Sequence, residues 1–287
     1  MIRSVNSDSA GERVFPRIFA LLALVRDGRL GSCSRLGSGT RVREAKGVKG
    51  ASRLRVGSWN IGTLSGKSIE LVKILKKRRI NIACVQETKW VGPKAKDVDG
   101  YKLWFSGKLR YRNGVGILVD SELRDQVVEC YAPRSGFGRG GKKALWEDLD
   151  EVVVSIRLRE KLFIGRDLNG HIGSVSRGYD EVHGGFDFGD KNGGRVSLLD
   201  FAKAFGLMVS NSSFPKKEEH LVTFRSSVAV TQIDFLLLRK DDKGLCKDYK
   251  VIPSENLTTQ HKLLVMDLEI RRKKKKKKVV DGHRPRD

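Results

Sequence analysis

Leu162-Phe163-Ile164-Gly165-Arg166-Asp167-Leu168-Asn169-Gly170-His171 is an apolar run that ends in closely spaced polar residues. The apolar residues predict a buried strand, and the polar residues mark its end. Because side chains alternate along a strand, Asp167 and Asn169 are expected to point to the same side. Hydrolysis of a phosphodiester needs a carboxylate that takes a proton from water and a neighbour that holds that water. A turn rich in Asp and Asn that closes a strand is the alternative interpretation.

The apolar pattern outside this stretch predicts strands that alternate with helices. Ser65-Gly66-Lys67-Ser68 predicts the opening of a helix, whose buried side would hold Ile69, Leu71, Val72, Ile74 and Leu75. A second helix is predicted at residues 196–208, with Gly206 as its stop signal. Strands are predicted at residues 54–59, 80–85, 115–119, 161–164, 232–238 and 264–270. Strands interleaved with helices indicate an α/β or α+β sandwich with one core.

The positive charge is concentrated at both ends of the chain. The net charge is +23; residues 1–55 hold 12 Lys or Arg against 4 Asp or Glu, and residues 271–287 hold 10 against 2. Composition predicts a disordered basic leader at residues 1–52, one domain at residues 53–270 and a disordered Lys/Arg-rich tail at residues 271–287. The apolar residues 18–25 are interpreted as a short hydrophobic patch in the leader.

The C-terminal cationic run predicts contact with polyphosphate. Such runs repel themselves, stay extended and pair with nucleic acid or with an import receptor, so DNA binding and a nuclear location are expected. A tail that serves solubility alone is the alternative. No apolar run approaches the ~20 residues that span a membrane, and no feature indicates an obligate protein partner. The run consists of Arg271, Arg272, Lys273, Lys274, Lys275, Lys276, Lys277 and Lys278.

Polar residues recur at the ends of the other predicted strands. Asn60 follows Trp59, Glu87 stands in Gln-Glu-Thr, Asp234 lies among apolar residues, and His261 precedes an apolar run. A buried acid costs several kcal/mol unless it is paired or binds a metal. Each residue also has an ordinary structural interpretation, as a turn residue, a surface cap, a buried hydrogen-bond partner or a loop histidine.

The order of these motifs resembles that of the endonuclease/exonuclease/phosphatase family. This family includes apurinic endonucleases, DNase I and the endonuclease domains of non-long-terminal-repeat retrotransposons. The series W-N, Q-E-T, Y-A-P, D-x-N, Q-I-D and a late His covers about residues 54–270. The sequence at residues 58–64, 85–90 and 167–173 looks like that of plant RTE-type retrotransposon endonucleases. This group includes the craniofacial development protein 2-like proteins. The resemblance implies an α+β fold, a four-layer α/β/β/α sandwich of the DNase I type.

The resemblance also implies a divalent-metal-dependent DNA endonuclease of retrotransposon origin. Glu87 would hold Mg²⁺ or Mn²⁺ with Asn60 close by, since these ions prefer carboxylate and amide oxygens. The ion would neutralise the scissile phosphate. The residues expected to act on water and phosphate are Asp167 to activate the water, Asn169 to hold it, His261 and Tyr131 to contact the phosphate, and Asp234 to orient His261.

Three departures from the family pattern support a competing hypothesis. Arg166 stands where relatives have glycine, and its charge beside Asp167 is expected to lower the pKa of that acid. Gln260 replaces an aspartate before His261, which should lower cation affinity. About two core strands are expected to be missing between Val119 and Tyr131. The alternative is therefore an inactive relic that binds nucleic acid through its basic tails; a small phosphoester substrate is a third possibility.

Overall fold

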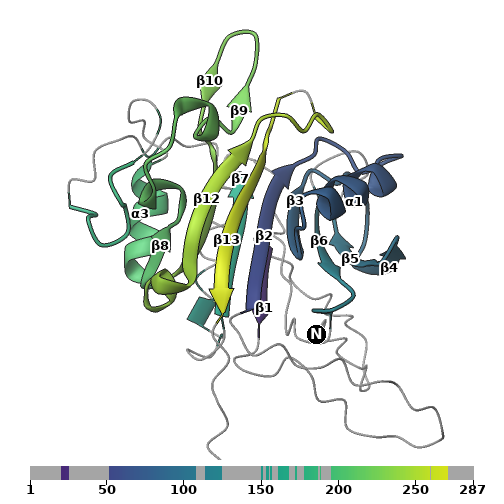
Figure 1. The fold of residues 1–287 in the computed structure, drawn as a ribbon, viewed down its shortest axis with the longest axis horizontal. Helices are drawn as coiled ribbons and strands as arrows, with labels where there is room; N and C mark the ends of the chain where they lie inside the picture. The colour runs from purple at the N-terminus through teal and green to yellow at the C-terminus, as the bar shows by residue number, and fades with distance from the viewer. Residues whose placement is uncertain are drawn as a thin grey trace, which may run out of the picture.

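A computed structural model describes most of the predicted domain. The described residues are 21–25 (backbone), 52–107, 114–124, 161–167, 178–186, 195–258 and 260–270, together with 150, 153, 154, 156, 172 and 188. Among the described residues, two β-sheets and the helices α1 and α3 make up the body of the fold (Figure 1). Of the described helices, not one combines the length and hydropathy that a membrane crossing requires.

The larger sheet has seven strands in the order β12-β13-β2-β3-β6-β5-β4. Strands β2 and β3 run parallel, and the other neighbours are antiparallel. Helix α1 (Ser68–Lys77) provides the crossover between the parallel pair, as such a pair requires. The strands are β2 (Ser52–Asn60), β3 (Ile82–Gln86), β4 (Lys94–Val98), β5 (Tyr101–Ser106), β6 (Val115–Asp120), β12 (Cys246–Ile252) and β13 (Leu263–Ile270).

The smaller sheet has four antiparallel strands in the order β1-β7-β11-β8. A separate hairpin of β9 (Phe224–Arg225) and β10 (Val230–Thr231) stands out from one end of the sandwich (Figure 1). The remaining elements are β1 (Leu21–Val25), β7 (Lys161–Asp167), α3 (Arg195–Ala204), β8 (Leu207–Val209), β11 (Asp234–Arg239) and three 3₁₀ turns, η1 (Asn211–Ser213), η2 (Glu218–His220) and η3 (Lys240–Leu245).

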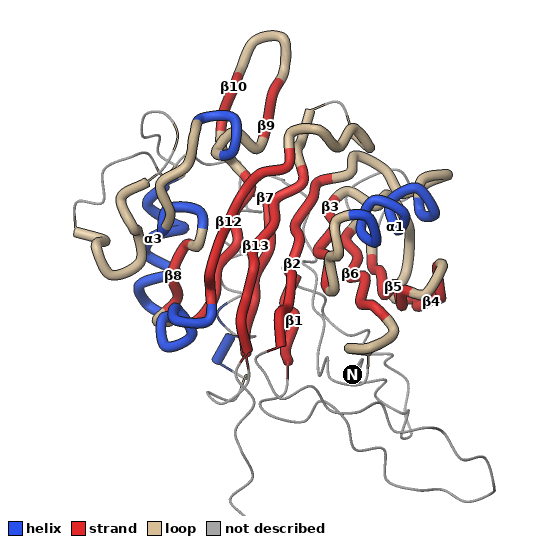
Figure 2. Tube along the Cα trace, in the orientation of Figure 1, coloured by secondary structure: helices blue, strands red, loops and turns tan. Residues whose placement is uncertain are grey.

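Alternation of side chains along the strands produces three buried clusters, which separate four layers. Figure 2 shows α1 and α3 on opposite sides of the strands. Val56 and Cys84 of the larger sheet share one buried cluster with Phe163 of the smaller sheet, so the two sheets pack face to face. Val85 points the other way and joins the cluster beneath α1. Ile164 likewise points away from the other sheet and joins the cluster that includes α3. The predicted α/β/β/α sandwich is therefore confirmed.

Two details of the predicted helices are wrong. Ile69 was expected on the buried side of α1 but is 59% exposed, because it precedes the stripe formed by Leu71, Val72 and Leu75. The second helix ends at Ala204 rather than at residue 208. Gly206 has a positive φ of 58°, which reverses the chain so that the next residue begins β8.

The expected disordered leader contains a strand. Leu21–Val25 forms β1, which pairs with β7 with Leu22 opposite Ile164, so the interpretation of these residues as a patch in a tail is wrong. Strand β1 gives β7 a second hydrogen-bonding neighbour, so that among the described strands β1, and not β7, forms the edge of the sheet. The basic tail, and most of the region where two strands were expected to be missing, lie outside the described residues.

Candidate active site

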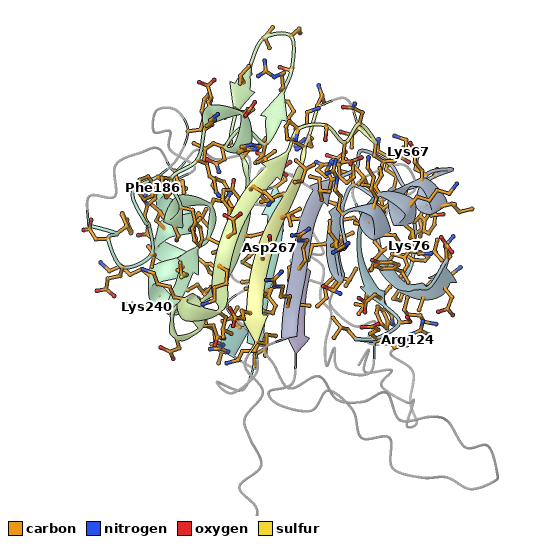
Figure 3. The ribbon with its side chains drawn as sticks, viewed as in Figure 1. Lys67, Lys76, Arg124, Phe186, Lys240 and Asp267 are labelled. Carbon is orange, nitrogen blue, oxygen red and sulfur yellow. The ribbon has the colours of Figure 1, made fainter. Side chains whose placement is uncertain are left out.

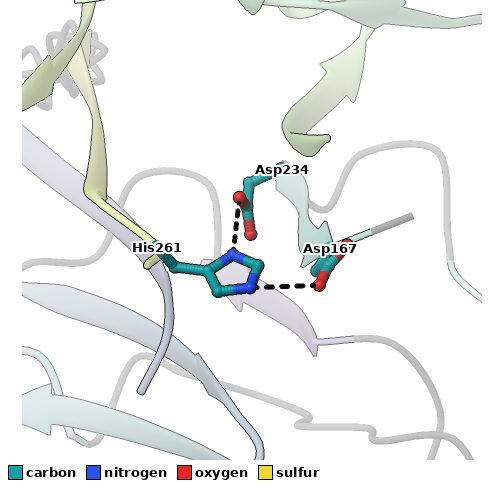
Figure 4. Close-up of side chains that lie close together, drawn as sticks. All are labelled: Asp167, Asp234 and His261. Carbon is teal, nitrogen blue, oxygen red and sulfur yellow. Dashed lines mark hydrogen bonds and ion pairs between the residues drawn. The ribbon is translucent and has the colours of Figure 1, made fainter. Parts of the chain in front are cut away.

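The strands bring their polar end residues to one end of the inter-sheet core. Asn60 lies on the same face of β2 as Val56, and Asp167 lies on the same face of β7 as Phe163. Asp234 begins β11 directly opposite Asp167 in the antiparallel register. The apolar space between the sheets therefore ends in a cluster of polar groups that come from both sheets (Figure 4).

His261 lies between two carboxylates. Its Nδ1 is 3.1 Å from Asp234 Oδ2, and its Nε2 is 3.8 Å from Asp167 Oδ2 (Figure 4). One ligand atom from each of the three residues lies within 4.8 Å of the others. Like charges directly opposite each other on neighbouring strands repel. A protonated imidazole between the two acids relieves that repulsion.

The surroundings of His261 favour its protonated form. Burial alone would lower the pKa of this imidazole, but the hydrogen bond and charge of Asp234 and the charges of Asp167 and Glu87 act in the opposite direction. The net result is a pKa above the ordinary value for histidine. His261 is thus suited to donate a hydrogen bond to an anionic group.

Asn60 ties the two sheets together at this point. Its Nδ2 donates to Glu87 Oε1 at 3.0 Å and to Asp167 Oδ2 at 3.2 Å, while its Oδ1 accepts from the Gly62 N–H at 3.1 Å. Ionised carboxylates only accept hydrogen bonds, so the amide nitrogen must face them. In this orientation Asn60 holds two acids with its amide nitrogen, and its role as a metal contact stays a prediction.

Glu87 has a backbone conformation that is rare for its residue type. Its φ is +56°, and Lys89 two residues later has a φ of +57°. The turn is fixed by Thr88, whose N–H donates to Gly114 O at 3.0 Å and whose carbonyl accepts from Leu64 N at 3.1 Å. Such strain persists where the surroundings impose it, and it is concentrated at functional sites.

The cluster has the donor atoms that a hard divalent cation requires. Glu87, Asp167 and Asp234 are three acids around a single imidazole, which leaves the site negative. Both Glu87 Oε1 and Asp167 Oδ2 lie within hydrogen-bond distance of the same amide nitrogen, so they are close together. Carboxylate oxygens are the ligands that Mg²⁺ and Mn²⁺ prefer, so the site fits such an ion.

Several residues that support the site carried little or no signal in the sequence. Thr223 Oγ1 accepts from the main-chain N–H of Asp234 at 3.1 Å, and Asn211 Nδ2 donates to the Asp234 carbonyl at 2.8 Å. Trp59 Nε1 donates to the His261 carbonyl at 3.1 Å. Trp59 belongs to a recognised motif, whereas Thr223 and Asn211 stand in no motif and are identified by the fold alone.

The β9–β10 hairpin borders the histidine. The rings of Phe224 and His261 meet edge to face with their centroids 4.9 Å apart, and the two residues form an isolated β-bridge. The next residue, Arg225, donates its N–H to the Gln260 carbonyl at 2.9 Å. The hairpin therefore holds the segment that carries the histidine, and the Gln260 side chain is left exposed.

Arg166 lies on the opposite face of β7 from Asp167. It is buried opposite Phe235, on the side that packs against α3, and its Nε donates to the Asp167 main-chain carbonyl at 3.2 Å. Burial lowers the pKa of Arg166 to about 10, against the opposing effect of the Asp167 charge. Within the described part of the chain, no hydrogen-bond partner faces the buried Nη1. The main consequence of this arginine is therefore a buried cation behind the site.

Some predicted site residues lie outside the described residues. These are Tyr131, Asn169 and the cationic run from Arg271 to Lys278. Asn60, Glu87, Asp167, Asp234 and His261 are described, and the structure brings all five together. Their chemical roles remain predictions.

Comparison with solved structures identifies the fold. An AP endonuclease from Archaeoglobus fulgidus matches 74% of this chain and 98% of its own, with 19% identity and a TM-score of 0.54. A 3′-5′ exonuclease, NExo, from Neisseria meningitidis matches 75% and 99%, with 16% identity and the same TM-score of 0.54. The endonuclease domain of TRAS1, a telomere-specific non-LTR retrotransposon, matches 77% and 100%, with 14% identity and a TM-score of 0.54.

These likenesses define the class of fold. The chain has the DNase I-like fold that these nucleases share, with a polar cluster at one end of the inter-sheet core. No protein-family model matches the sequence, and a search of the curated proteins found no match.

Proposed function

We propose that the protein hydrolyses phosphodiester bonds of DNA with the help of a divalent cation. The observation that carries the proposal is the arrangement of His261 between Asp167 and Asp234, with Glu87 tied to Asp167 through Asn60. Solved structures with the same fold include DNA-processing enzymes, one of them bound to a product DNA hairpin. The retrotransposon-like motifs favour an endonuclease derived from such an element.

The protein's own groups would divide the chemistry between them. Asp167 would accept a proton from the attacking water, since its carboxylate is partly exposed whereas that of Asp234 is buried. Protonated His261 would donate a hydrogen bond to a phosphate oxygen as negative charge develops there. Asp234 would hold Nδ1 of His261 and thereby keep Nε2 directed toward the substrate.

Glu87 would hold the cation, Mg²⁺ or Mn²⁺. When bound, the ion would supply positive charge next to the scissile phosphate and the leaving oxygen. Asn60 would keep Glu87 at a fixed distance from Asp167. The strained turn at Glu87 fits this role, because it directs the carboxylate toward the cluster and not along the strand.

A plasmid-nicking assay tests the proposal. Full-length protein should convert supercoiled plasmid to the open circle in Mg²⁺ or Mn²⁺, with loss of activity in EDTA. His261→Gln should abolish nicking, whereas Asp97→Ala should not, because Asp97 is an exposed acid on β4, the edge strand of the larger sheet. Failure of folded protein to nick at any concentration of either ion would refute the proposal.

The second candidate function is nucleic-acid binding without catalysis. The buried cation of Arg166 favours it, because an unpartnered buried nitrogen is rare in native proteins and this one serves no step of the proposed reaction. In that case DNA binding should be sensitive to salt and should survive His261→Gln. It should also fall when residues 271–278 are deleted, and unchanged binding without them would count against it.

A further inference from the structure

Gln86 connects the two sheets directly beneath the candidate site. It is the last residue of β3, and its buried amide lies on the face that meets the other sheet. Nε2 donates to Ser58 Oγ at 3.1 Å within the larger sheet and to the Gly165 carbonyl at 3.2 Å in the smaller sheet. A carbonyl oxygen can only accept, so the amide nitrogen must face Gly165.

The sheets come very close together at this point. A Cβ atom on Gly165 would lie 3.0 Å from both Cβ and Oγ of Ser58 and 3.1 Å from Cβ of Cys84. Such a distance is tighter than nine in ten real Cβ contacts, so a side chain there would require the neighbouring strands to give way by a few tenths of an ångström. The missing side chain is what allows the main chain of β7 to come within reach of the Gln86 amide.

The candidate site is divided between the same two sheets. The larger sheet and its connections supply Asn60, Glu87 and His261, whereas the smaller sheet supplies Asp167 and Asp234. Two hydrogen bonds cross the gap within the site, from Asn60 to Asp167 at 3.2 Å and between His261 and Asp234 at 3.1 Å. A shift of one sheet against the other would therefore lengthen both.

Gln86 is placed to prevent that shift. It immediately precedes Glu87, and its two acceptors, Ser58 and Gly165, lie two residues before Asn60 and Asp167 on their strands. Its own Oε1 is buried and, as far as the described residues extend, has no hydrogen-bond partner. A side chain selected for stability alone would not bury an unpaired oxygen, because doing so costs free energy.

We propose that Gln86 is a positioning residue that fixes the larger sheet against the smaller one and so sets the distance between Glu87 and Asp167. Gln86 contacts Ser58 and Gly165, and its effect on the reaction would be exerted through the two acids. The part of this inference that concerns the reaction rests on the proposed function. The part that concerns the geometry of the site does not.

Gln86→Met is the test, because methionine has a similar volume and no donor. The matched control is Asn81→Ala, just before the other end of β3, where Asn81 Oδ1 accepts from Arg55 N at 2.9 Å and Nδ2 donates to Asp120 at 2.7 Å. Each variant loses the two hydrogen bonds of one amide side chain, at opposite ends of β3; those of Gln86 are buried and those of Asn81 are partly buried. Measurements are made on the full chain, below the temperature at which either variant begins to melt.

The first readout needs neither metal nor substrate. The Asn60 side-chain amide protons donate to Glu87 and Asp167, so their exchange with water reports on the bond across the sheets. They are assigned by NMR from the spectrum of Asn60→Asp. Exchange should become faster, by roughly 10-fold, in Gln86→Met and should stay unchanged in Asn81→Ala. Unchanged exchange in Gln86→Met overturns the inference whether or not the protein cuts DNA.

The second readout is the nicking reaction. Gln86→Met should lower kcat by about 10- to 100-fold, as loss of a group that orients a metal ligand does, and should leave KM for DNA unchanged. Asn81→Ala should retain the kcat of the unmodified protein. Equal losses in the two variants would show that Gln86 acts through stability alone. A wild-type chain that does not nick refutes the proposed function, and the exchange experiment then still decides the role of Gln86.

Discussion

Strand β7 carries two neighbouring charged residues with opposite surroundings. Asp167 points into the space between the sheets, where Asn60 and His261 contact its carboxylate. Arg166 points toward the helix side, where its guanidinium is buried and its Nη1 has no partner among the described residues. Adjacent positions on a strand thus differ completely in environment, because side chains alternate between faces. The charge of Asp167 therefore belongs to the candidate site, whereas the charge of Arg166 is buried outside it.

Removing the charge of Asp167 should have the largest effect. Asp167→Asn keeps the shape of the side chain but cannot accept a proton from water. We expect a loss of about 10²- to 10⁴-fold in the nicking rate, the range that general-base catalysis contributes. Single-turnover nicking measures the loss, and DNA binding measured in parallel should change little. A variant that nicks as fast as the wild type would remove Asp167 from the reaction.

A second prediction concerns the pKa of His261, the histidine that contacts Asp167. Asp234→Asn should lower the pKa of His261, because the hydrogen bond and charge of Asp234 raise it. If protonated His261 assists the reaction, the rate falls as the pH rises through the pKa of His261. The pH–rate profile of Asp234→Asn should therefore decline at lower pH than that of the wild type. Superimposable profiles would contradict this assignment.

The same interaction links folding stability to pH. The folded-state pKa of His261 is raised, so the stabilisation is complete below the unfolded value of about 6.5 and is lost as the pH rises through the folded value. Asp234→Asn should remove this part of the pH dependence. Chemical denaturation of both proteins across that range provides the measurement, with Asp97→Ala as the control on an exposed acid.

The sequence was sufficient to predict the residues around Asp167 on one face of β7, but not the surroundings of Arg166 on the other face. The motif order predicted that Asp167, Asp234, His261, Asn60 and Glu87 belong together, and the described structure brings them together. The expected effect of Arg166 was to lower the pKa of Asp167, whereas in the structure the arginine itself bears the cost of burial. The sequence shows that Arg166 and Asp167 are adjacent. It does not show what surrounds the Arg166 side chain, because that depends on how α3 and β11 pack.

Other features were beyond the sequence for a similar reason. Thr223 and Asn211 hold the main chain of Asp234, and hydrogen bonds to main-chain atoms leave no distinctive spacing. The pairing of β1 with β7 joins segments that are distant in the chain, so local composition predicted disorder at Leu21–Val25.

The outer face of the larger sheet carries ion pairs that lie far from the site. One of them joins Asp267 on β13 to Arg55 (Figure 3).

Replacing Arg166 tests the other side of the comparison. Arg166→Met keeps most of the aliphatic volume and removes the buried cation. We expect stabilisation of about 1–4 kcal/mol near neutral pH, as for other replacements of buried charge by apolar groups. The penalty should be present below the folded pKa of about 10 and relieved above it, because deprotonation then removes the charge. Thermal melting at pH 7 measures the effect, and a lower melting temperature would show that the guanidinium is stabilising.

The smallest expected effect lies between the two charged residues. Gly165→Ala adds one methyl group where Ser58 and Cys84 are already within about 3 Å, so the sheets must separate slightly or the strands must shift. We expect a loss of about 1–3 kcal/mol in stability, the usual cost of overpacking.

The two substitutions at neighbouring residues should therefore change folding stability in opposite directions: Arg166→Met raises it and Gly165→Ala lowers it. Because Gly165 faces the site and Arg166 does not, Gly165→Ala should also slow nicking, whereas Arg166→Met should leave its rate close to that of the wild type. Equal effects of the two variants on the rate would show that the two faces of β7 are not independent.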